Sequence, residues 1–171
     1  MTPVTWQDRR VPETIDEIDA RLLQALGEDP RSTAVALAER LGLSRNTVQA
    51  RLVRLEQRGI LRSFERRIDP ARLGYPLRAF VNAQVDQRRL ADIGTALAAI
   101  PEVIEVCGLT GASDLMVQVV AVDADDLYRI AGHILASPGV ERTNISLVMR
   151  ELVPYRLAPL LERVHSAQPE T

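Results

Sequence analysis

Apolar residues recur every three to four positions in three short segments before residue 60, which predicts three amphipathic helices. The segments cover residues 14–27, 33–41 and 44–59. A capping box is predicted at the start of the first helix, with Thr14 as the cap and Glu17 reaching back to it. Thr33 and Ser44 are predicted to cap the second and third helices.

The second and third helices are separated only by Gly42 and Leu43, and the third is rich in arginine. Two short helices joined by a glycine-containing turn are typical of a helix-turn-helix. Arginine, asparagine and glutamine at the N-terminal end of the third helix suit the acceptors and donors of a DNA major groove. Taken alone, this helix is equally well explained as a solvated basic face, and the helix before it shifts the balance toward DNA binding.

After residue 76 the period of the pattern changes from helical to alternating. Residues 77–85 alternate as a half-buried strand, and further strands are predicted over 103–109, 115–122 and 140–152. Two helices, 90–100 and 127–135, lie between these strands, and residues 110–114 form a loop. Similar Pro-containing turns at Pro101 and Pro138 indicate an internal repeat of helix and strand. The order βαββαβ predicts a ferredoxin-like plait whose uncovered sheet face pairs with a second copy.

The domain boundaries follow from these changes in pattern. Residues 60–68 alternate as a short strand pair, or wing, and residues 69–76 carry two prolines and one glycine. The chain is therefore predicted to be α+β, a winged helix-turn-helix followed by a ferredoxin-like βαββαβ domain. The predicted parts are a flexible arm (1–13), a winged helix-turn-helix (14–68), a linker (69–76), a ferredoxin-like domain (77–152) and a C-terminal tail (153–171).

Charge is unevenly divided between these parts. The whole chain carries a net charge of −2, but residues 31–67 hold nine arginines against three acids, a net charge of +6. Residues 68–171 hold nine arginines against thirteen acids, a net charge of −4. The positive charge is thus concentrated on the segment that is predicted to bind nucleic acid.

Other classes of protein are poorly supported. The single Cys107 excludes an internal disulfide and a multi-cysteine metal site, and no apolar run is long enough to span a membrane. We expect a cytoplasmic protein with no metal and no cofactor. The two histidines, His133 and His165, are far apart in the sequence, and no phosphate loop or nucleophile elbow is present, so we expect no enzymatic activity.

Over residues 14–152 the sequence resembles the Lrp/AsnC, or feast/famine, family of transcription regulators. The resemblance rests on the order and spacing of short pieces: Ile15-Asp-Glu-Ile-Asp19, Leu37-Ala38, Leu43-Ser44, Val48, Arg51, Leu55, Gly59-Ile60, Leu73-Gly74, Pro101-Glu-Val103, Thr110-Gly111, Asp114 and Pro138-Gly-Val140. It implies a winged helix-turn-helix on a RAM-type domain, a homodimer formed through the sheets, and a higher assembly such as an octamer. It also implies double-stranded DNA and a small effector, commonly an amino acid, as partners.

The resemblance also implies the site residues. Ser44, Arg45, Asn46 and Gln49 would face bases, while phosphate contact or support of the helix pair would fall to Thr33, Arg51 and Arg54, and the wing to Arg62, Arg66 and Arg67. An internal bridge from Arg51 to Glu39 is the alternative to its DNA contact. The effector would bind to the loop of Leu109, Thr110, Gly111, Ala112, Ser113 and Asp114, in which Asp114 fixes the loop. A plain hairpin loop is the alternative there.

Two further functions remain as alternatives to a sequence-specific regulator. An architectural protein would bind DNA with little sequence preference and a steep salt dependence. A haem-pathway decarboxylase shares the two-domain plan but needs His and Arg lining a large pocket, which two scattered histidines do not favour.

Overall fold

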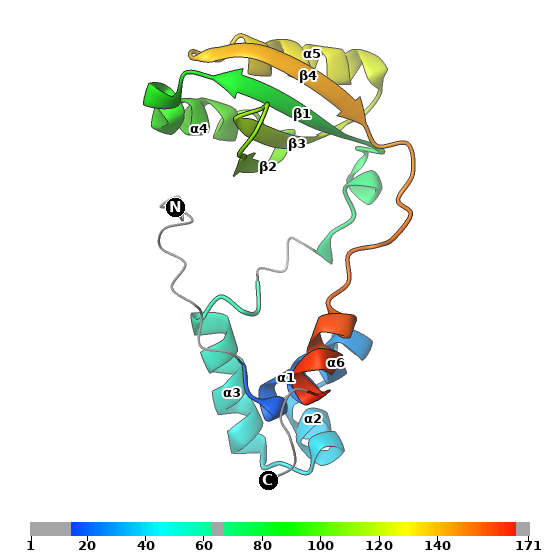
Figure 1. The fold of residues 1–171 in the computed structure, drawn as a ribbon. Helices are drawn as coiled ribbons and strands as arrows, with labels where there is room; N and C mark the ends of the chain where they lie inside the picture. Colours follow the sequence, from blue (N-terminus) through cyan, green and yellow to red (C-terminus); the bar gives the residue numbers. More distant parts are fainter. Residues whose placement is uncertain (1–14, 63–66, 167–171) are drawn as a thin grey trace. The chain divides into compact units, whose positions relative to one another are not determined.

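A computed structural model describes residues 15–62 and 67–166, which fall into two compact units (Figure 1). We call residues 15–62 together with 154–166 the helical unit, and residues 67–153 the sheet unit. The chain therefore leaves the helical unit once and returns to it after completing the sheet unit.

The three predicted helices of the helical unit are present. They are α1 (Glu17–Glu28), α2 (Ala34–Leu41) and α3 (Arg45–Gln57). The predicted caps of α2 and α3 are confirmed, because Thr33 Oγ1 accepts from the Ala36 amide and Ser44 Oγ accepts from the Thr47 amide. The turn between α2 and α3 depends on Gly42, whose φ of 68° lies in the left-handed region.

The capping box that was predicted for α1 is wrong. Asp16 is the N-cap, and its carboxylate accepts from the Asp19 amide at 2.8 Å. Glu17 is the first helical residue, and Thr14 lies outside the described residues. A carboxylate at this position both accepts the hydrogen bond and meets the positive end of the helix dipole, which favours Asp16 as the cap.

The core of the helical unit draws on all three helices. Leu22 of α1, Leu37 of α2, and Val48 and Leu55 of α3 are almost completely buried in one cluster. Each such side chain stabilises the fold by about 1.5–3 kcal/mol relative to an exposed one. This shared core fixes the angle at which α3 leaves the turn.

The segment after α3 differs from the predicted wing. Residues 63–66 lie outside the described residues, and the described neighbours 60–62 and 67–68 contain no strand. The linker includes a short 3-10 helix, η3 (Pro70–Leu73), which Asp69 caps.

The C-terminal segment contains a helix that the sequence analysis missed. Within the residues assigned to a tail, α6 (Ala158–Ser166) belongs to the helical unit and packs on α1. Pro154 and Pro159 read as helix breakers in the sequence. Pro159 instead occupies the first turn of α6, where a proline costs little because that amide has no helical partner.

The sheet unit confirms the predicted order βαββαβ. Its strands are β1 (Leu77–Val85), β2 (Val103–Gly108), β3 (Leu115–Ala121) and β4 (Val140–Leu147), antiparallel in the order β2-β3-β1-β4. The helices are α4 (Leu90–Ala98) and α5 (Ala124–Leu135), with a 3-10 turn, η4 (Gln87–Arg89), before α4.

The last strand is five residues shorter than predicted. Leu147 pairs with Ala79, and the amide of Val148 donates to the Arg78 carbonyl near the start of β1. Since β1 begins at Leu77, the chain beyond Val148 has no neighbouring strand to pair with. The prediction of a strand to residue 152 is wrong for this reason.

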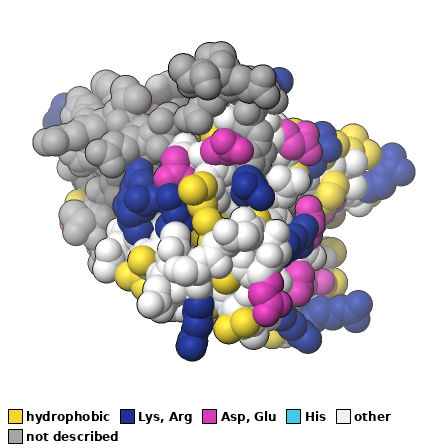
Figure 2. Space-filling view, turned by 90° about the horizontal axis from the view of Figure 1, so that it is seen from below, with side chains coloured by type: hydrophobic (Ala, Val, Ile, Leu, Met, Phe, Trp, Pro, Cys, Tyr) yellow, Lys and Arg dark blue, Asp and Glu magenta, His cyan; other side chains and the backbone are white. Residues whose placement is uncertain are grey.

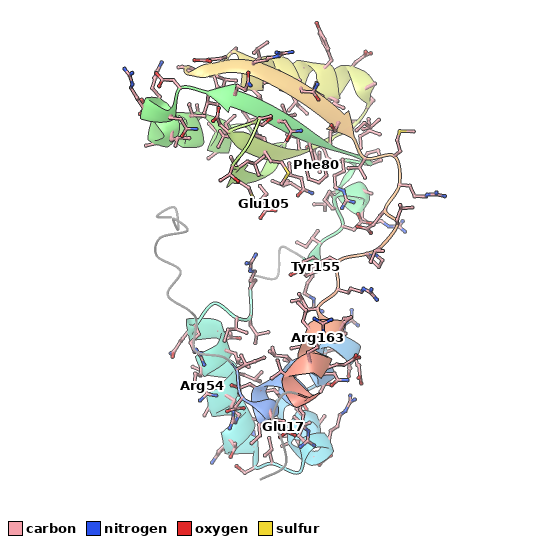
Figure 3. All side chains as sticks on the ribbon, viewed as in Figure 1. Glu17, Arg54, Phe80, Glu105, Tyr155 and Arg163 are labelled. Atoms are coloured by element: carbon pink, nitrogen blue, oxygen red, sulfur yellow. The ribbon has the colours of Figure 1, made fainter. Side chains whose placement is uncertain are left out.

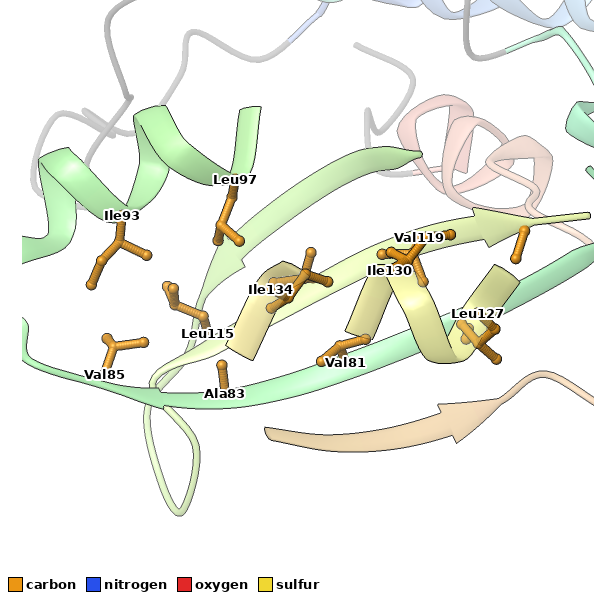
Figure 4. Packing of buried hydrophobic residues seen from close by; sticks show 13 residues of the cluster. Val81, Ala83, Val85, Ile93, Leu97, Leu115, Val119, Leu127, Ile130 and Ile134 are labelled. Carbon is orange, nitrogen blue, oxygen red and sulfur yellow. The ribbon is translucent and has the colours of Figure 1, made fainter. Parts of the chain in front are cut away.

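Helices α4 and α5 cover one face of the sheet. Alternate β1 residues, among them Val81 and Val85, are buried against Ile93 and Leu97 of α4 and Ile130 of α5 (Figure 4). The opposite face of the sheet, which we call the open face, carries Phe80 and Asn82 of β1, with Gln118 and Met116 opposite them on β3. In the same register Glu105 of β2 lies opposite Gln118, and the side chains of Phe80 and Glu105 are labelled in Figure 3.

Candidate nucleic-acid interface and effector loop

The N-terminal end of α3 presents polar side chains to solvent. Arg45, Asn46 and Gln49 are all exposed, while Val48 between them is completely buried in the core. Residues three and four apart lie on one side of a helix, so Gln49 is a neighbour of both Arg45 and Asn46. Arginine, asparagine and glutamine can each make paired hydrogen bonds to base edges, and all three were predicted to face bases.

Arg51 points away from that surface and into the helical unit. Its Nη1 donates to Asp19 Oδ1 at 2.7 Å and to Asp16 Oδ2 at 2.6 Å. Asp19 is completely buried, and its other oxygen accepts from Arg54 Nη2 at 2.6 Å. The internal alternative for Arg51 thus holds, but with Asp16 and Asp19 as its partners in place of Glu39, and the side chain holds α3 against α1.

The same contacts shift the pKa values of Asp16 and Arg51. Partial burial raises the pKa of Asp16, but the hydrogen bonds from Arg51 and from the Asp19 amide, together with the arginine charges, outweigh it, and the net pKa is lowered. The hydrogen bond to Asp16 raises the pKa of Arg51. The ion pairs therefore persist at neutral pH.

The acids of α1 neutralise part of the positive charge that the sequence analysis counted. Arg40 pairs with Glu28, in addition to the pairs of Arg51 and Arg54 with Asp16 and Asp19. Figure 2 shows arginine side chains interspersed with acidic and apolar ones. Charge counted over residues 31–67 alone overstates the positive charge of the folded unit, because α1 lies outside that window.

The three remaining predicted DNA contacts, Thr33, Ser44 and Arg62, are exposed. Thr33 caps α2 with its hydroxyl oxygen, and Arg62 stands next to the segment 63–66, which the structure does not describe. Arg66, one of the predicted wing arginines, lies within that segment.

The predicted effector loop, residues 109–114, joins β2 to β3 and is closed by hydrogen bonds. The Leu109 amide donates to the Asp114 carbonyl at 2.7 Å, and Gly111 has a φ of 116°. Both carboxylate oxygens of Asp114 are engaged, Oδ2 by the Val85 amide at 2.9 Å and Oδ1 by Gln87 Nε2 at 2.5 Å. Asp114 therefore anchors the loop to the end of β1.

A hollow of about 150 Å³ lies beside this loop. Ser113 is the only loop residue that lines it, and the others come from β1 and β4: Asn82, Gln84, Arg142, Thr143 and Asn144. Gln84 also donates to the Ala112 carbonyl at 3.0 Å, which joins β1 to the loop. Sequence reasoning missed the strand residues, because only the sheet register brings them next to Ser113.

Neither a metal site nor a membrane span emerges from the described ranges. No group of three His, Cys, Asp or Glu residues within 15–62 and 67–166 could hold a metal ion. Over the same residues, no helix has the length and apolar character that crossing a membrane requires.

A helix-turn-helix with an exposed polar end, followed in the same chain by a ferredoxin-like domain, defines a DNA-binding transcription regulator with a separate ligand-binding domain. The family model "AsnC-type helix-turn-helix domain" matches residues 15–56. The model "Lrp/AsnC ligand binding domain" matches residues 78–158. The chain belongs to the Lrp/AsnC family of transcriptional regulators.

Individual relatives agree with this assignment. The transcriptional regulator AldR of Mycolicibacterium smegmatis is 34% identical over 155 residues, which cover 88% of this chain and 90% of AldR. A Neisseria meningitidis transcriptional regulator solved with L-methionine has a TM-score of 0.73 and 29% identity, covering 86% of this chain and 99% of its own. A feast or famine regulatory protein of M. tuberculosis, also with L-methionine, has a TM-score of 0.73 and 31% identity, covering 84% of this chain and 97% of its own.

Proposed function

We propose that this regulator reads a specific DNA sequence with the N-terminal end of α3, and that an amino acid bound beside the 109–114 loop adjusts its DNA affinity. The observation that supports DNA binding is the exposure of Arg45, Asn46 and Gln49 on a helix whose opposite side is buried. Such a helix can enter a major groove without disturbing the core of its own unit.

The contacts of α3 suggest which side chains contact bases, which contact phosphate and which hold the helix in place. Ser44, Arg45, Asn46 and Gln49 contact bases, and Thr33 lies at the start of α2, where amides and a hydroxyl suit phosphate. Arg51 and Arg54 mainly hold α3 in its orientation and do not contact bases, because Asp19 of α1 already accepts hydrogen bonds from both guanidinium groups. Arg62 contacts the DNA backbone next to the recognition helix.

The hollow beside the loop supports the proposal that a small effector binds there. A volume of about 150 Å³ is below the range of pockets for drug-sized ligands and suits a smaller molecule. Arg142 offers a positive charge for a carboxylate, and Asn82, Gln84 and Asn144 offer amide groups for further hydrogen bonds. Two relatives solved with L-methionine make a free amino acid the leading ligand class.

A second copy of the chain is the proposed occupant of the open face. Apolar and polar side chains alternate on this face, where Phe80 and Met116 are half-buried and Val120 is almost fully buried beside Asn82 and Gln118. A twofold dimer formed there would contain two recognition helices, the number that a pseudo-palindromic site requires. Further association of dimers into an octamer would follow the family plan.

The test is a binding measurement on genomic fragments that include the region upstream of the protein's own gene. Affinity is measured at two salt concentrations, with and without L-methionine and then the other amino acids. We expect selective binding that one amino acid strengthens or weakens. Tight but unselective binding with a steep salt slope would instead indicate an architectural protein.

The Arg142→Ala variant serves as the control for the effector. Because Arg142 lies on β4 of the sheet unit, the variant keeps the DNA affinity of the ligand-free protein and loses its response to the amino acid. An unchanged response would place the effector elsewhere.

A further inference from the structure

The C-terminal helix α6 presents one apolar side. Leu157, which directly precedes the helix, and Leu160, Leu161 and Val164 within it recur at the spacing of a single helical face. Within this set Leu161 and Val164 are half-buried, whereas Leu160 is 56% exposed. The element against which α6 packs is α1 (Figure 1).

Helix α1 is buried on two sides, which its role in a three-helix unit does not explain. Leu22 is completely buried in the core that α1 forms with α2 and α3. Ala20 is also completely buried, although a residue two positions away points about 200° around the helix. Since α6 packs on α1, we assign the covering of Ala20 to α6.

Helix α6 lies almost entirely beyond the part of the chain that the family models match. The ligand-binding domain model ends at residue 158, and α6 begins at Ala158. The contact between α6 and α1 therefore lies outside both domain matches.

We propose that α6 is a clasp, a fourth helix of the DNA-binding unit that ties α1 to the last strand of the regulatory domain. The chain then joins the two units twice, first through residues 63–76 and again through residues 148–157. A second connection limits the orientations of the DNA-binding unit, and pre-organisation of this kind improves binding by reducing the entropy lost on association.

The clasp also gives a continuous route from the hollow to the recognition helix. Residues 142–144 of β4 line the hollow, and β4 leads through residues 148–157 into α6. Helix α6 packs on α1, and Asp19 of α1 holds Arg51 and Arg54 of α3.

The test compares two neighbouring leucines of α6 in the full-length protein. Leu161→Asp buries a charge against α1, whereas Leu160→Asp places the same charge on a side chain that is mostly exposed. Amide hydrogen exchange is read on α1, with α5 in the other unit as the internal reference. Leu161→Asp speeds exchange in α1 by about tenfold or more and leaves α5 unchanged, while Leu160→Asp stays near wild type.

The milder Leu161→Ala variant guards against gross unfolding and gives an intermediate increase in exchange. Unchanged α1 exchange in Leu161→Asp would overturn the clasp.

Binding to the upstream DNA fragment is the second readout, and this part rests on the proposed function. Leu161→Asp weakens binding by about tenfold through lost pre-organisation. If the wild type binds no DNA, the proposed function fails, while the exchange result still decides whether α6 stabilises α1.

Discussion

Arg51 of the recognition helix donates to Asp19 of α1 across 2.7 Å, and Asp19 is completely buried. A buried carboxylate is costly unless it is paired, so α3 is held to α1 at a fixed rotation about its own axis. That rotation decides which side chains face outward. Under the proposed function, the role of Arg51 is therefore to position Arg45 and Gln49.

Replacing Arg51 by methionine should destabilise the protein. The substitution leaves Asp19 with only Arg54 as an ionic partner, and breaking such a pair costs about 3 kcal/mol. Urea unfolding at neutral pH measures the loss. The matched control is Arg45→Met, an exposed position at which the change stays within about 0.5 kcal/mol. Wild-type stability together with uniformly weakened DNA binding in Arg51→Met would make Arg51 a phosphate contact instead.

The helical unit should lose stability in acid. The pKa of Asp16 is lowered in the folded protein from its ordinary value of 3.8, since its bonds to Arg51 and the Asp19 amide outweigh its partial burial. A lowered folded pKa contributes stability that is fully present above the unfolded pKa and is lost as the pH falls through the folded value. We expect this contribution to be constant from pH 7 to about pH 5 and to be lost progressively below about pH 4, as the pH falls through the lowered folded pKa.

The Asp16→Asn variant isolates this effect. Asparagine still caps a helix but does not titrate, so the variant is less stable at neutral pH and its unfolding free energy falls less steeply in acid. Denaturant titrations at pH 7, 5 and 3 compare the two proteins. Parallel acid profiles would show that the Asp16 pair makes no such contribution.

Substitution of Asp114, which anchors the effector loop, should weaken the loop without weakening DNA binding by the ligand-free protein. Asp114→Ala leaves the Val85 amide and Gln87 without their acceptor, which costs about 1–3 kcal/mol in the unfolding free energy. Because Asp114 belongs to the sheet unit, DNA affinity without ligand is retained while the response to the amino acid is lost. Asp114→Asn keeps one carbonyl acceptor and loses less. Simultaneous loss of DNA binding and of the response would mean that the loop supports the whole fold.

Local signals were sufficient to predict much of the fold. Thr33 and Ser44 cap the helices that they were predicted to cap, since a cap depends on residues within three positions. The alternation in 77–85 gave β1, because burial on one face of a strand repeats every second residue. The βαββαβ order followed from the sequence of such segments.

Features that depend on distant residues could not be predicted in this way. The partner of Arg51 lies 32 residues earlier in the chain, and the end of β4 is set by the start of β1. The packing of α6 on α1 likewise depends on a return of the chain that no local pattern specifies. The exposure of Arg45, Asn46 and Gln49 could be predicted because the apolar stripe of α3 itself shows which side of the helix is buried.

The central claim is that the N-terminal end of α3 reads bases, and Arg45→Ala tests it most directly. Affinity is measured for the DNA fragment selected by the wild type and for its single-base substitutions, at two salt concentrations. The account predicts a loss of about 1–3 kcal/mol on the selected fragment and a relaxed preference at one base pair. Equal weakening on every sequence, with a shallower salt slope, would contradict base reading by Arg45 and make it a phosphate contact.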